Sequence, residues 1–328
     1  RGLCAASGQK GTEMKILVTP RSFKNSVNDE AREKLEQFAE VKAVKPEKPF
    51  TEDELIALLD GCDGYVAGLD NVTAKVIENC PQLKVISRWG VGYDKVDTAA
   101  AAKAGITVTY TPGVMAVSVA ELALGLMLDC ARRITVQDGQ VRGGAWAPIN
   151  GMELFGKTVG IIGYGAIGKQ LGRLTNGIGM TTYAYDPFMN EAYAKEHNVL
   201  AADIDFIVRN CDIVSVHVPY MESTKNIISR ERIFSMKDGA ILINAARGGL
   251  VDEAAAAEAL QSGKLAAAAF DAFEQEPLKD SPLLTAPNAI LLPHTGSHTV
   301  DATKRMGMLA VDNVIRELSG TDCGYRVK

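Results

Sequence analysis

Short apolar runs alternate along the chain with segments whose apolar residues recur every three or four positions. Such runs are typical of strands buried on both faces of a parallel sheet, and the longer periodicity predicts amphipathic helices. Before residue 111 the pattern predicts strands at Lys15–Thr19, Val41–Val44, Gly64–Ala67, Lys84–Ser87 and Thr107–Tyr110. Helices are expected between them at Asp29–Glu40, after Thr51 (with Glu54 completing a capping box), at Ala74–Asn79 and at Val96–Ala104. This alternation indicates a parallel α/β sheet that is complete before residue 111.

The segment Ser118–Arg133 is the most strongly apolar helix that the pattern predicts. A second helix is expected over much of Ile134–Gly143. Because Ser118–Arg133 is too apolar for a free surface helix, we expect it to pack between domains or against a second subunit.

A glycine fingerprint follows the next predicted strand, Val159–Ile162. Gly163 would permit a tight strand-to-helix turn, Gly165 close approach of a pyrophosphate to the backbone, and Gly168 close packing of helix on strand. The helix N-terminus that follows offers N–H groups to phosphates. A further strand at Thr181–Tyr185 ends on Asp186, whose carboxylate can accept hydrogen bonds from ribose hydroxyls and would repel a 2′-phosphate. The segment therefore predicts dinucleotide binding, with NAD preferred over NADP.

The rest of the chain continues the alternation. Strands are expected at Ile213–Val218, Ala240–Asn244, Leu265–Asp271 and Ala289–Leu292. Helices are expected near Glu191–His197, Ile204–Asn210, Arg230–Met236, Glu253–Ser262 and Val300–Leu318. The last helix should pack back on the N-terminal sheet. The predicted domains are thus a discontinuous one, residues 14–110 with 299–328, and a nucleotide-binding one, residues 111–298.

Composition limits the classes of partner. The chain has 328 residues, 47% of them hydrophobic and 23% charged, and a net charge of −5 with both signs interspersed. This length suits about two domains, and nothing in the charge pattern suggests a nucleic-acid or polybasic membrane surface. The longest apolar runs are too short and too interrupted to span a bilayer. We therefore expect neither nucleic acid nor membrane as a partner.

The cysteines and the N-terminus predict a cytoplasmic protein without a metal site. The six cysteines are scattered and form no CxxC pair, and the four histidines form no HExxH motif. This argues for free thiols in a reducing compartment. Residues 1–13 are polar and lack the apolar centre of a secretory signal, so we interpret them as a disordered extension or a remnant of cloning.

Arg247, Glu276 and His294 are the candidates for catalysis, because each follows a predicted strand of the second domain. A guanidinium can bind a carboxylate through two hydrogen bonds, and a carboxylate beside an imidazole fixes its tautomer for proton transfer. Each residue also has a plain structural interpretation: a surface cation, a loop-closing acid and a turn histidine. Their separation in sequence says nothing about proximity.

A set of motifs resembles the D-isomer-specific 2-hydroxyacid dehydrogenase family. The matching stretches, in order, are RWGVGYDKVD (Arg88–Asp97), TPG and AELALGLML (Thr111–Gly113, Ala120–Leu128), GKTVGIIGYGAIGK (Gly156–Lys169), YDP (Tyr185–Pro187), CDIVSVHVP (Cys211–Pro219), INAARGGLVDE (Ile243–Glu253), AAFDAFEQEP (Ala268–Pro277) and LPHTGSHT (Leu292–Thr299). The resemblance implies two doubly wound α/β domains, a Rossmann NAD-binding domain and a flavodoxin-like substrate domain, with a cleft between them. It also implies a homodimer built on the Ser118–Arg133 helix.

The resemblance assigns roles to individual residues. Arg247, Glu276 and His294 match the family's catalytic positions. Val91 and Gly92 would contact the substrate carboxylate, with Arg88 and Trp89 beside them; Trp89 either shapes the pocket or fills core. The implied cofactor-binding residues are Gly163, Gly165, Ala166, Ile167, Gly168, Asp186, Pro187, His217, Val218, Pro219, Thr224, Ala245, Ala246, Asp271 and Gly296, with Asp271 expected at the nicotinamide carboxamide.

Within that family the sequence is most similar to D-3-phosphoglycerate dehydrogenases, in a short form without the C-terminal regulatory domain, which implies serine biosynthesis. It departs from them at Gly68–Asn71, where an Arg-Ser pair is common. A substrate phosphate would therefore need Arg21, Lys24, Arg88 or Arg132 of the partner subunit. Glyoxylate or hydroxypyruvate reduction is the alternative within the class. A catalytically silent NAD(H)-sensing corepressor is the alternative of another class.

Overall fold

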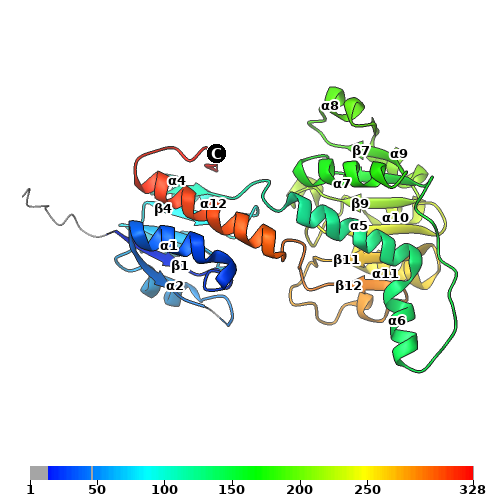
Figure 1. Ribbon diagram of the computed structural model, residues 1–328, viewed down its shortest axis with the longest axis horizontal. Coiled ribbons are helices and arrows are strands. Elements are labelled where there is room, and N and C mark those ends of the chain that lie inside the picture. The colour runs from blue at the N-terminus through cyan, green and yellow to red at the C-terminus, as the bar shows by residue number, and fades with distance from the viewer. Residues whose placement is uncertain (1–13, 46, 328) are drawn as a thin grey trace, which may run out of the picture. The chain divides into compact units, whose positions relative to one another are not determined.

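The computed structural model describes residues 14–45 and 47–327 (Figure 1). The predictions for residues 1–13 lie outside this part of the chain. Its contacts divide the chain into two compact units. Unit 1 runs up to Val114 and resumes at Thr299, and unit 2 is Met115–His298.

Unit 1 is built on a five-stranded parallel sheet in the order β2-β1-β3-β4-β5. The strands are β1 (Lys15–Val18), β2 (Glu40–Ala43), β3 (Gly64–Ala67), β4 (Val85–Arg88) and β5 (Thr107–Thr109). Strand β3 is buried at every residue, whereas β2 alternates between exposed and half-buried residues, as expected for an edge strand. This is the strand order of flavodoxin-like sheets, whose direction of winding reverses between β1 and β3.

Helices cover both faces of this sheet. They are α1 (Asp29–Phe38), α2 (Glu52–Leu59), α3 (Ala74–Glu78), α4 (Thr98–Lys103) and α12 (Val300–Leu318), with a 3₁₀ turn η1 (Ser26–Asn28). Helix α12 packs on β4 and β3 beside α1, and the two helices lie next to each other in Figure 1. The Ser87 hydroxyl donates to the Ala310 carbonyl at 2.8 Å, so β4 is joined to a helix that starts more than two hundred residues later.

Unit 2 is a seven-stranded parallel sheet in the order β12-β11-β10-β9-β6-β7-β8. The strands are β6 (Thr158–Ile162), β7 (Thr181–Tyr185), β8 (Val199–Ala201), β9 (Ile213–Val216), β10 (Ala240–Asn244), β11 (Leu265–Phe270) and β12 (Ala289–Leu291). The helices are α5 (Ala116–Arg132), α6 (Ile134–Arg142), α7 (Ala166–Gly177), α8 (Glu191–Glu196), α9 (Ile204–Asn210), α10 (Arg230–Ser235) and α11 (Glu253–Gln261), with 3₁₀ turns η2 (Glu222–Thr224) and η3 (Pro282–Thr285). Two apolar cores line its faces, one under α5 and α7 and the other under α9, α10 and α11. The prediction of two parallel-sheet α/β domains is confirmed.

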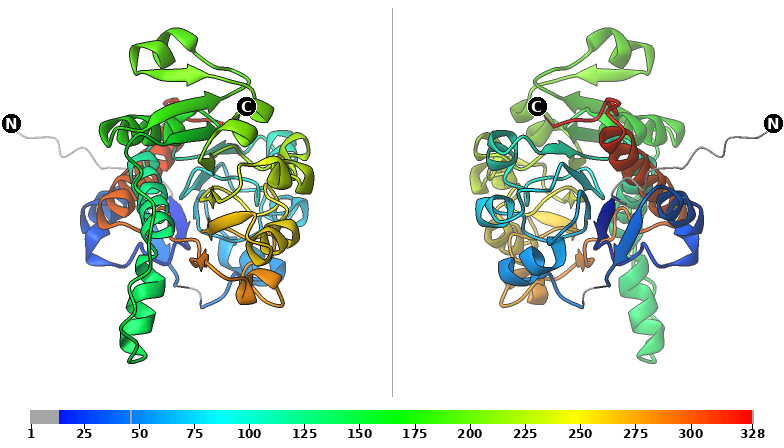
Figure 2. Two further views of the ribbon diagram at one scale, coloured as in Figure 1. Left: turned by 90° about the vertical axis from the view of Figure 1, so that its right-hand side faces the viewer. Right: turned by 90° about the vertical axis from the view of Figure 1, so that its left-hand side faces the viewer.

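Helix α6 differs from the rest, since none of its residues is buried. Figure 2 shows it projecting from its unit in both views. In the first turn of α6 (Ile134–Arg142), the Thr135 N–H donates a hydrogen bond to the Asp129 carboxylate of α5 at 2.9 Å. Arg133 adopts a left-handed φ of 57° at the junction between the two helices.

Several predicted boundaries were wrong. The first helix ends at Phe38 and not at Glu40, because Ala39 is already extended and Glu40 begins β2. The strand predicted at Ile213–Val218 stops at Val216, and the His217 carbonyl that follows lies against Gly163. Strand β8 was not predicted at all.

The described cysteines, Cys62, Cys80, Cys130, Cys211 and Cys323, are free and buried. Among the described helices, none has the length and apolarity to cross a membrane.

Candidate active site

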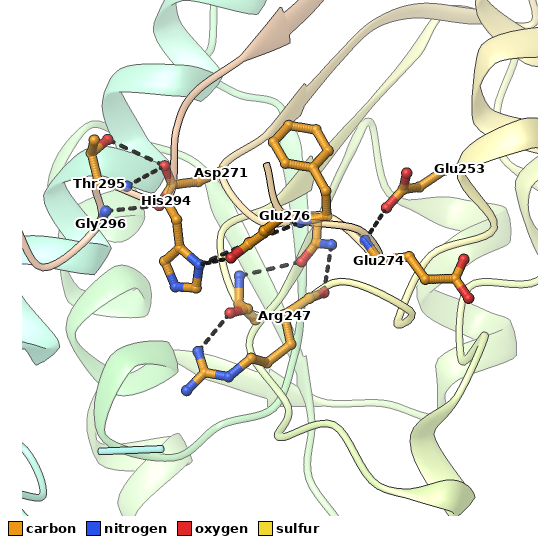
Figure 3. A network of polar contacts seen from close by, with 11 residues as sticks. Arg247, Glu253, Asp271, Glu274, Glu276, His294, Thr295 and Gly296 are labelled. Atoms are coloured by element: carbon orange, nitrogen blue, oxygen red, sulfur yellow. Dashed lines mark hydrogen bonds and ion pairs between the residues drawn. The ribbon is translucent and has the colours of Figure 1, made fainter. Parts of the chain in front are cut away.

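His294 and Glu276 form an ion pair beyond the carboxyl ends of neighbouring strands. The imidazole Nδ1 lies 2.9 Å from Oε1 and 3.0 Å from Oε2 of Glu276 (Figure 3). His294 follows β12 and Glu276 follows β11, which are paired strands of the same sheet. Both side chains are about two-fifths exposed, 43% for His294 and 40% for Glu276, so the pair can be reached from solvent. A carboxylate facing Nδ1 keeps the proton on that nitrogen and leaves Nε2 to exchange a proton with a ligand.

Asp271 fixes the turn that carries His294. Its buried carboxylate accepts hydrogen bonds from the backbone N–H of Thr295 and of Gly296, both at 2.7 Å, and from the Thr295 hydroxyl at 3.2 Å. From α5, the Ser118 hydroxyl donates to the Gly296 carbonyl at 2.7 Å. The turn is therefore held from two sides. The contact of the same carboxylate with a nicotinamide carboxamide stays a prediction.

The segment that carries Glu276 is held in the same way. The Phe273 N–H donates to Oε1 of Glu276 at 3.2 Å, and the Glu274 N–H donates to Glu253 at 2.7 Å. Burial, followed by the charges of Glu274 and Glu276, raises the pKa of Glu253. A Cβ on Gly248 would clash with the Phe273 carbonyl, so the loop after β10 lies directly against this segment.

Arg247 belongs to that loop. The Asn244 side chain donates to its backbone carbonyl at 2.9 Å, and its guanidinium donates to the Ala246 carbonyl at 2.8 Å. In Figure 3 the Arg247 guanidinium and the His294 ring lie on the same side of the network. The structure thus brings the three predicted catalytic residues to one edge of the sheet in unit 2.

The glycine fingerprint forms the turn that nucleotide binding requires. Gly163 has a φ of 102°, and a Cβ there would lie 2.6 Å from the His217 carbonyl. Gly165 precedes α7, and a Cβ on it would meet no atom within 4 Å, so the backbone at this point is open to a ligand. The Asp186 carboxylate accepts hydrogen bonds from the N–H groups of Tyr164 and Phe188, both at 2.9 Å. These residues fit a dinucleotide: an open glycine, a helix N-terminus and an acid beside the loop.

His217 directly follows β9, beside this turn. Its Nε2 lies 2.8 Å from the Ser215 hydroxyl, and its buried Nδ1 has no partner within the described chain. Burial lowers the pKa of His217 to about 4, so the ring is neutral at neutral pH. Of the other predicted cofactor residues, Thr224 closes the loop after β9 by donating to the Pro219 carbonyl at 2.7 Å.

The predicted substrate residues lie in unit 1, at the end of β4. The Arg88 guanidinium donates to the Ala67 carbonyl at 3.3 Å and to the Trp89 carbonyl. Trp89 is only 6% exposed and meets the Phe23 ring edge-on, with centroids 6.1 Å apart. Its ring therefore fills core, the second of the two interpretations left open by the sequence. Val91 and Gly92 are half-buried in the loop that follows.

Comparison with known proteins identifies the family. The family described as D-isomer specific 2-hydroxyacid dehydrogenase, NAD binding domain, matches residues 124–296. The chain belongs to this family. Its matched domain is an NAD-binding domain, as predicted, and NAD is the cofactor.

Two curated relatives and one solved structure show the extent of the similarity. The chain is 40% identical over 311 residues to D-3-phosphoglycerate dehydrogenase of Methanocaldococcus jannaschii, covering 94% of this chain and 58% of that protein. It is 42% identical over 272 residues to hydroxypyruvate reductase of Thermotoga maritima, covering 81% of this chain and 88% of that protein. The structure of the TT0316 protein from Thermus thermophilus matches with a TM-score of 0.86 and 34% identity, covering 96% of this chain and all of that one. The chain thus spans about three-fifths of the first of these family members.

Two features of the site were missed by sequence reasoning. Glu253 and Ser118 both contact the catalytic segments, yet neither stood out. The only signal for Glu253 was its place in the INAARGGLVDE stretch, at the start of a predicted helix. Outside the site, within the described part of the chain, Glu317, Asp322 and Cys323 bring potential metal-ligand atoms within 4.8 Å of one another. Arg326 pairs with both of these carboxylates, which supplies a charge partner without an ion.

Proposed function

We propose that the chain oxidises D-2-hydroxy acids, or reduces the matching 2-oxo acids, with NAD as the cofactor. The observation that carries this proposal is the Glu276–His294 pair beside Arg247. The nucleotide domain would be residues 111–298 and the substrate domain residues 14–110 with 299–328.

The protein's own groups have separate tasks in this reaction. When bound, the cofactor would supply a hydride to carbon 2 as NADH or accept one from carbon 2 as NAD⁺. Arg247 binds the substrate carboxylate and the oxygen on carbon 2, because a guanidinium can donate to both at once. Nε2 of His294 gives a proton to that oxygen in reduction and takes it back in oxidation. Glu276 orients the ring and stabilises its protonated form.

Two substrate classes have support from relatives. The D-3-phosphoglycerate dehydrogenase relative favours a phosphorylated acid. The hydroxypyruvate reductase relative, which the chain covers more fully, favours a small unphosphorylated acid. The direct test is NADH oxidation with glyoxylate, hydroxypyruvate and other 2-oxo acids, run beside 3-phosphoglycerate with NAD. Turnover of any of them supports the proposal. Tight NADH binding without turnover of any acid would contradict it and favour an NAD(H) sensor.

We also propose a homodimer through α5 and α6. Helix α6 buries none of its residues, and apolar side chains are exposed along this region: Leu128, Ile134, Val136, Val141 and Trp146. Trp146 is 88% exposed, which is unusual for a large aromatic side chain in a monomer. Sedimentation of the wild type against Trp146→Glu tests this; a monomeric wild type at micromolar concentration would contradict it.

A further inference from the structure

Two Asn-Gly pairs occur in the chain, Asn150–Gly151 and Asn176–Gly177. In such a pair the backbone nitrogen of the glycine can attack the side-chain carbonyl carbon of the asparagine, because glycine has no side chain to block the approach. The new C–N bond closes a succinimide ring as the bond to the side-chain nitrogen breaks, and ammonia leaves. Water then opens the ring at either carbonyl group, which gives aspartate or its isomer isoaspartate. Water is the only other reactant.

Asn176 lies in surroundings that oppose this reaction. It is the last residue but one of α7, and its NH₂ group donates to the His197 carbonyl at 2.7 Å and to the Asn198 carbonyl at 3.2 Å. Its side-chain oxygen accepts a hydrogen bond from the Thr182 hydroxyl at 2.8 Å. In a helix the next N–H points along the axis to the carbonyl of the preceding turn, away from this side chain. Cyclisation at Asn176 therefore requires the end of α7 to open first.

Asn150 lies instead in a stretch without regular structure, residues 145–154, on the connection from α6 to β6. Asn150 and Gly151 are both exposed. Among the residues that the structure describes, neither the Asn150 side chain nor the Gly151 N–H has a hydrogen-bond partner. The attacking nitrogen and the carbon that it attacks are thus free of competing bonds.

The chain on either side of this pair is held in place. The Ile149 N–H donates to Oε1 of Gln137 in α6 at 3.1 Å. The Met152 N–H donates to the carbonyl of Ala131 in α5 at 2.8 Å. Gly151 itself lies against the end of α5, because a Cβ on it would be only 2.6 Å from the Ala131 carbonyl oxygen. The main chain at this point therefore has no room for an added atom.

We propose that Asn150 is a site of covalent modification, at which the folded protein deamidates to aspartate and isoaspartate while Asn176 remains an amide. This inference does not rest on the proposed function. Isoaspartate carries one more main-chain atom than asparagine, directly before Gly151. Because Gly151 has no room beside the Ala131 carbonyl, the isomer should break the bond from the Met152 N–H and loosen the connection between α6 and β6.

The test follows both Asn-Gly pairs in the same sample by peptide mapping. Wild-type protein is kept folded at mildly alkaline pH, and mass spectrometry measures the mass gain that replacing NH₂ by OH produces in each peptide. We expect Asn150 to react at least about tenfold faster than Asn176, because the helix must open locally before Asn176 can react. Electron-transfer fragmentation then separates isoaspartate from aspartate.

The unfolded chain is the matched control. In urea neither pair has fixed surroundings, so the two rates should agree within about threefold. Asn150→Gln is the second control, because it keeps a neutral amide whose longer side chain closes a ring far more slowly. This variant should show no modification at position 150 over the same time.

Hydrogen exchange measures the structural consequence. The Met152 amide, protected in fresh protein by its bond to Ala131, should exchange faster as isoaspartate accumulates and should keep its protection in Asn150→Gln. Freshly prepared Asn150→Asp adds the charge without the extra main-chain atom, so it should also keep this protection.

The outcomes decide the inference independently of any turnover assay. Faster modification of Asn150 than of Asn176 in the folded protein supports it. Equal rates in the folded protein overturn it, because the fold would then make no difference between the two pairs. Asn150 that reacts in urea but not in the folded protein overturns it as well. Unchanged exchange of the Met152 amide in a sample rich in isoaspartate would overturn the expected loosening of the connection.

Discussion

Nδ1 of His294 lies almost equally far from the two carboxylate oxygens of Glu276, at 2.9 and 3.0 Å. Both lone-pair acceptors therefore face one ring nitrogen, and the proton stays there while Glu276 is ionised. Nε2 is left as the nitrogen that can exchange a proton with a substrate. The sequence alone could suggest that these two side chains pair, but it could not establish the pairing, because eighteen residues separate them.

Removing either member of this pair should affect chemistry and not cofactor binding. His294→Ala removes the proton donor, and we expect kcat to fall by about 10²- to 10⁴-fold. Glu276→Gln keeps the shape but loses the charge that fixes the tautomer, and a fall of about tenfold to a hundredfold is expected. Stopped-flow turnover and fluorescence titration of NADH measure the two effects separately. NADH affinity that falls in parallel with kcat would show that these residues hold the cofactor instead.

Asp271 should control the position of His294 through the Thr295–Gly296 turn. In Asp271→Asn one oxygen becomes an NH₂ group that faces a backbone N–H, so one buried donor loses its acceptor. The free energy of unfolding should fall by about 1 to 3 kcal/mol, and kcat should fall while the KM for NADH changes little. Chemical denaturation and steady-state kinetics measure both.

The matched control is Asp238→Asn, because Asp238 pairs with Lys264 at the surface, where its side chain is 92% exposed. No measurable loss of stability or activity is expected there. If Asp271→Asn retained wild-type kcat, the turn would be held sufficiently by Ser118 alone.

The sequence predicted the strands well where burial on both faces forces a continuous apolar run. Strand β10, AILIN, is buried at all its residues, and its bounds match the prediction. Strand β8 escaped because only Val199 is buried, while Leu200 and Ala201 are exposed at the sheet edge. A strand held mainly by backbone pairing to β7 leaves little trace in the side-chain pattern.

Some residues of the candidate site could likewise be predicted from the sequence, and others could not. Arg247, Glu276 and His294 could be predicted, because chemistry requires those residue types after strands of a parallel sheet. The role of Glu253 could not, because an acid in the first turn of a helix is ordinarily explained by the helix dipole. Only the fold places its carboxylate 2.7 Å from the Glu274 N–H. Likewise, Asp271 was expected to face a ligand, and its bonds to the turn needed the three-dimensional structure.

Asp186 should set the choice between NAD and NADP. Its carboxylate already shapes the loops through Tyr164 and Phe188, and its charge would repel a 2′-phosphate. In Asp186→Asn the ratio of kcat/KM for NADPH to that for NADH should rise by about tenfold, since the charge is lost but most of the shape remains. Glu191→Gln, a substitution nearby in sequence on α8, serves as the control and should leave the ratio unchanged. An unchanged ratio in Asp186→Asn would place the discrimination elsewhere.

At neutral pH the charge of Glu253 should lower the free energy of unfolding, although its hydrogen bond from the Glu274 N–H supports the catalytic segment. Its pKa is raised in the folded protein, chiefly by burial, so the ionised form is disfavoured there. Above the folded pKa this charge costs stability; below about pH 4.5 the carboxyl is protonated in both states and contributes nothing. Glu253→Gln should therefore raise the melting temperature at pH 8, with the gain disappearing as the pH falls towards 4.5.

Measurements of activity separate the role of the Glu253 hydrogen bond from the effect of its charge. In Glu253→Gln the new amide oxygen can still accept from the Glu274 N–H, so this variant should retain kcat within about threefold. Glu253→Ala should lose about fivefold to tenfold, near the worth of one hydrogen bond. Glu258→Gln on the same helix is the control, because its partner Arg230 lies away from the site, at the surface. Equal activity of the glutamine and alanine variants would show that the bond to Glu274 does not position Glu276.

His217 should make the protein less stable in mild acid. Its folded pKa is about 4, lowered by burial, against about 6.5 in the unfolded chain. Above pH 6.5 neither state binds the proton. As the pH falls from 6.5 towards 4, the unfolded chain takes up a proton that the folded ring refuses, so stability is lost across this window. The loss should reach roughly 2 to 3 kcal/mol by pH 4, since each pKa unit is worth about 1.4 kcal/mol and part of the ring is accessible to water.

The measurement is the free energy of unfolding from urea titrations between pH 7.5 and 4.5. His217→Gln cannot take up that proton, so its stability should fall less steeply over this range, whatever its absolute value. His197→Gln is the control: that ring stacks on Tyr193 with centroids 4.0 Å apart, outside the glycine turn, and the variant should keep the wild-type slope. Identical slopes for the wild type and His217→Gln would mean that the ring takes up its proton equally in the folded and the unfolded protein. A neutral ring against the Gly163 turn is the state in which its unpartnered Nδ1 could accept a hydrogen bond from a bound dinucleotide. For this reason, saturating NADH should raise the free energy of unfolding at pH 7.5 more in the wild type than in His217→Gln.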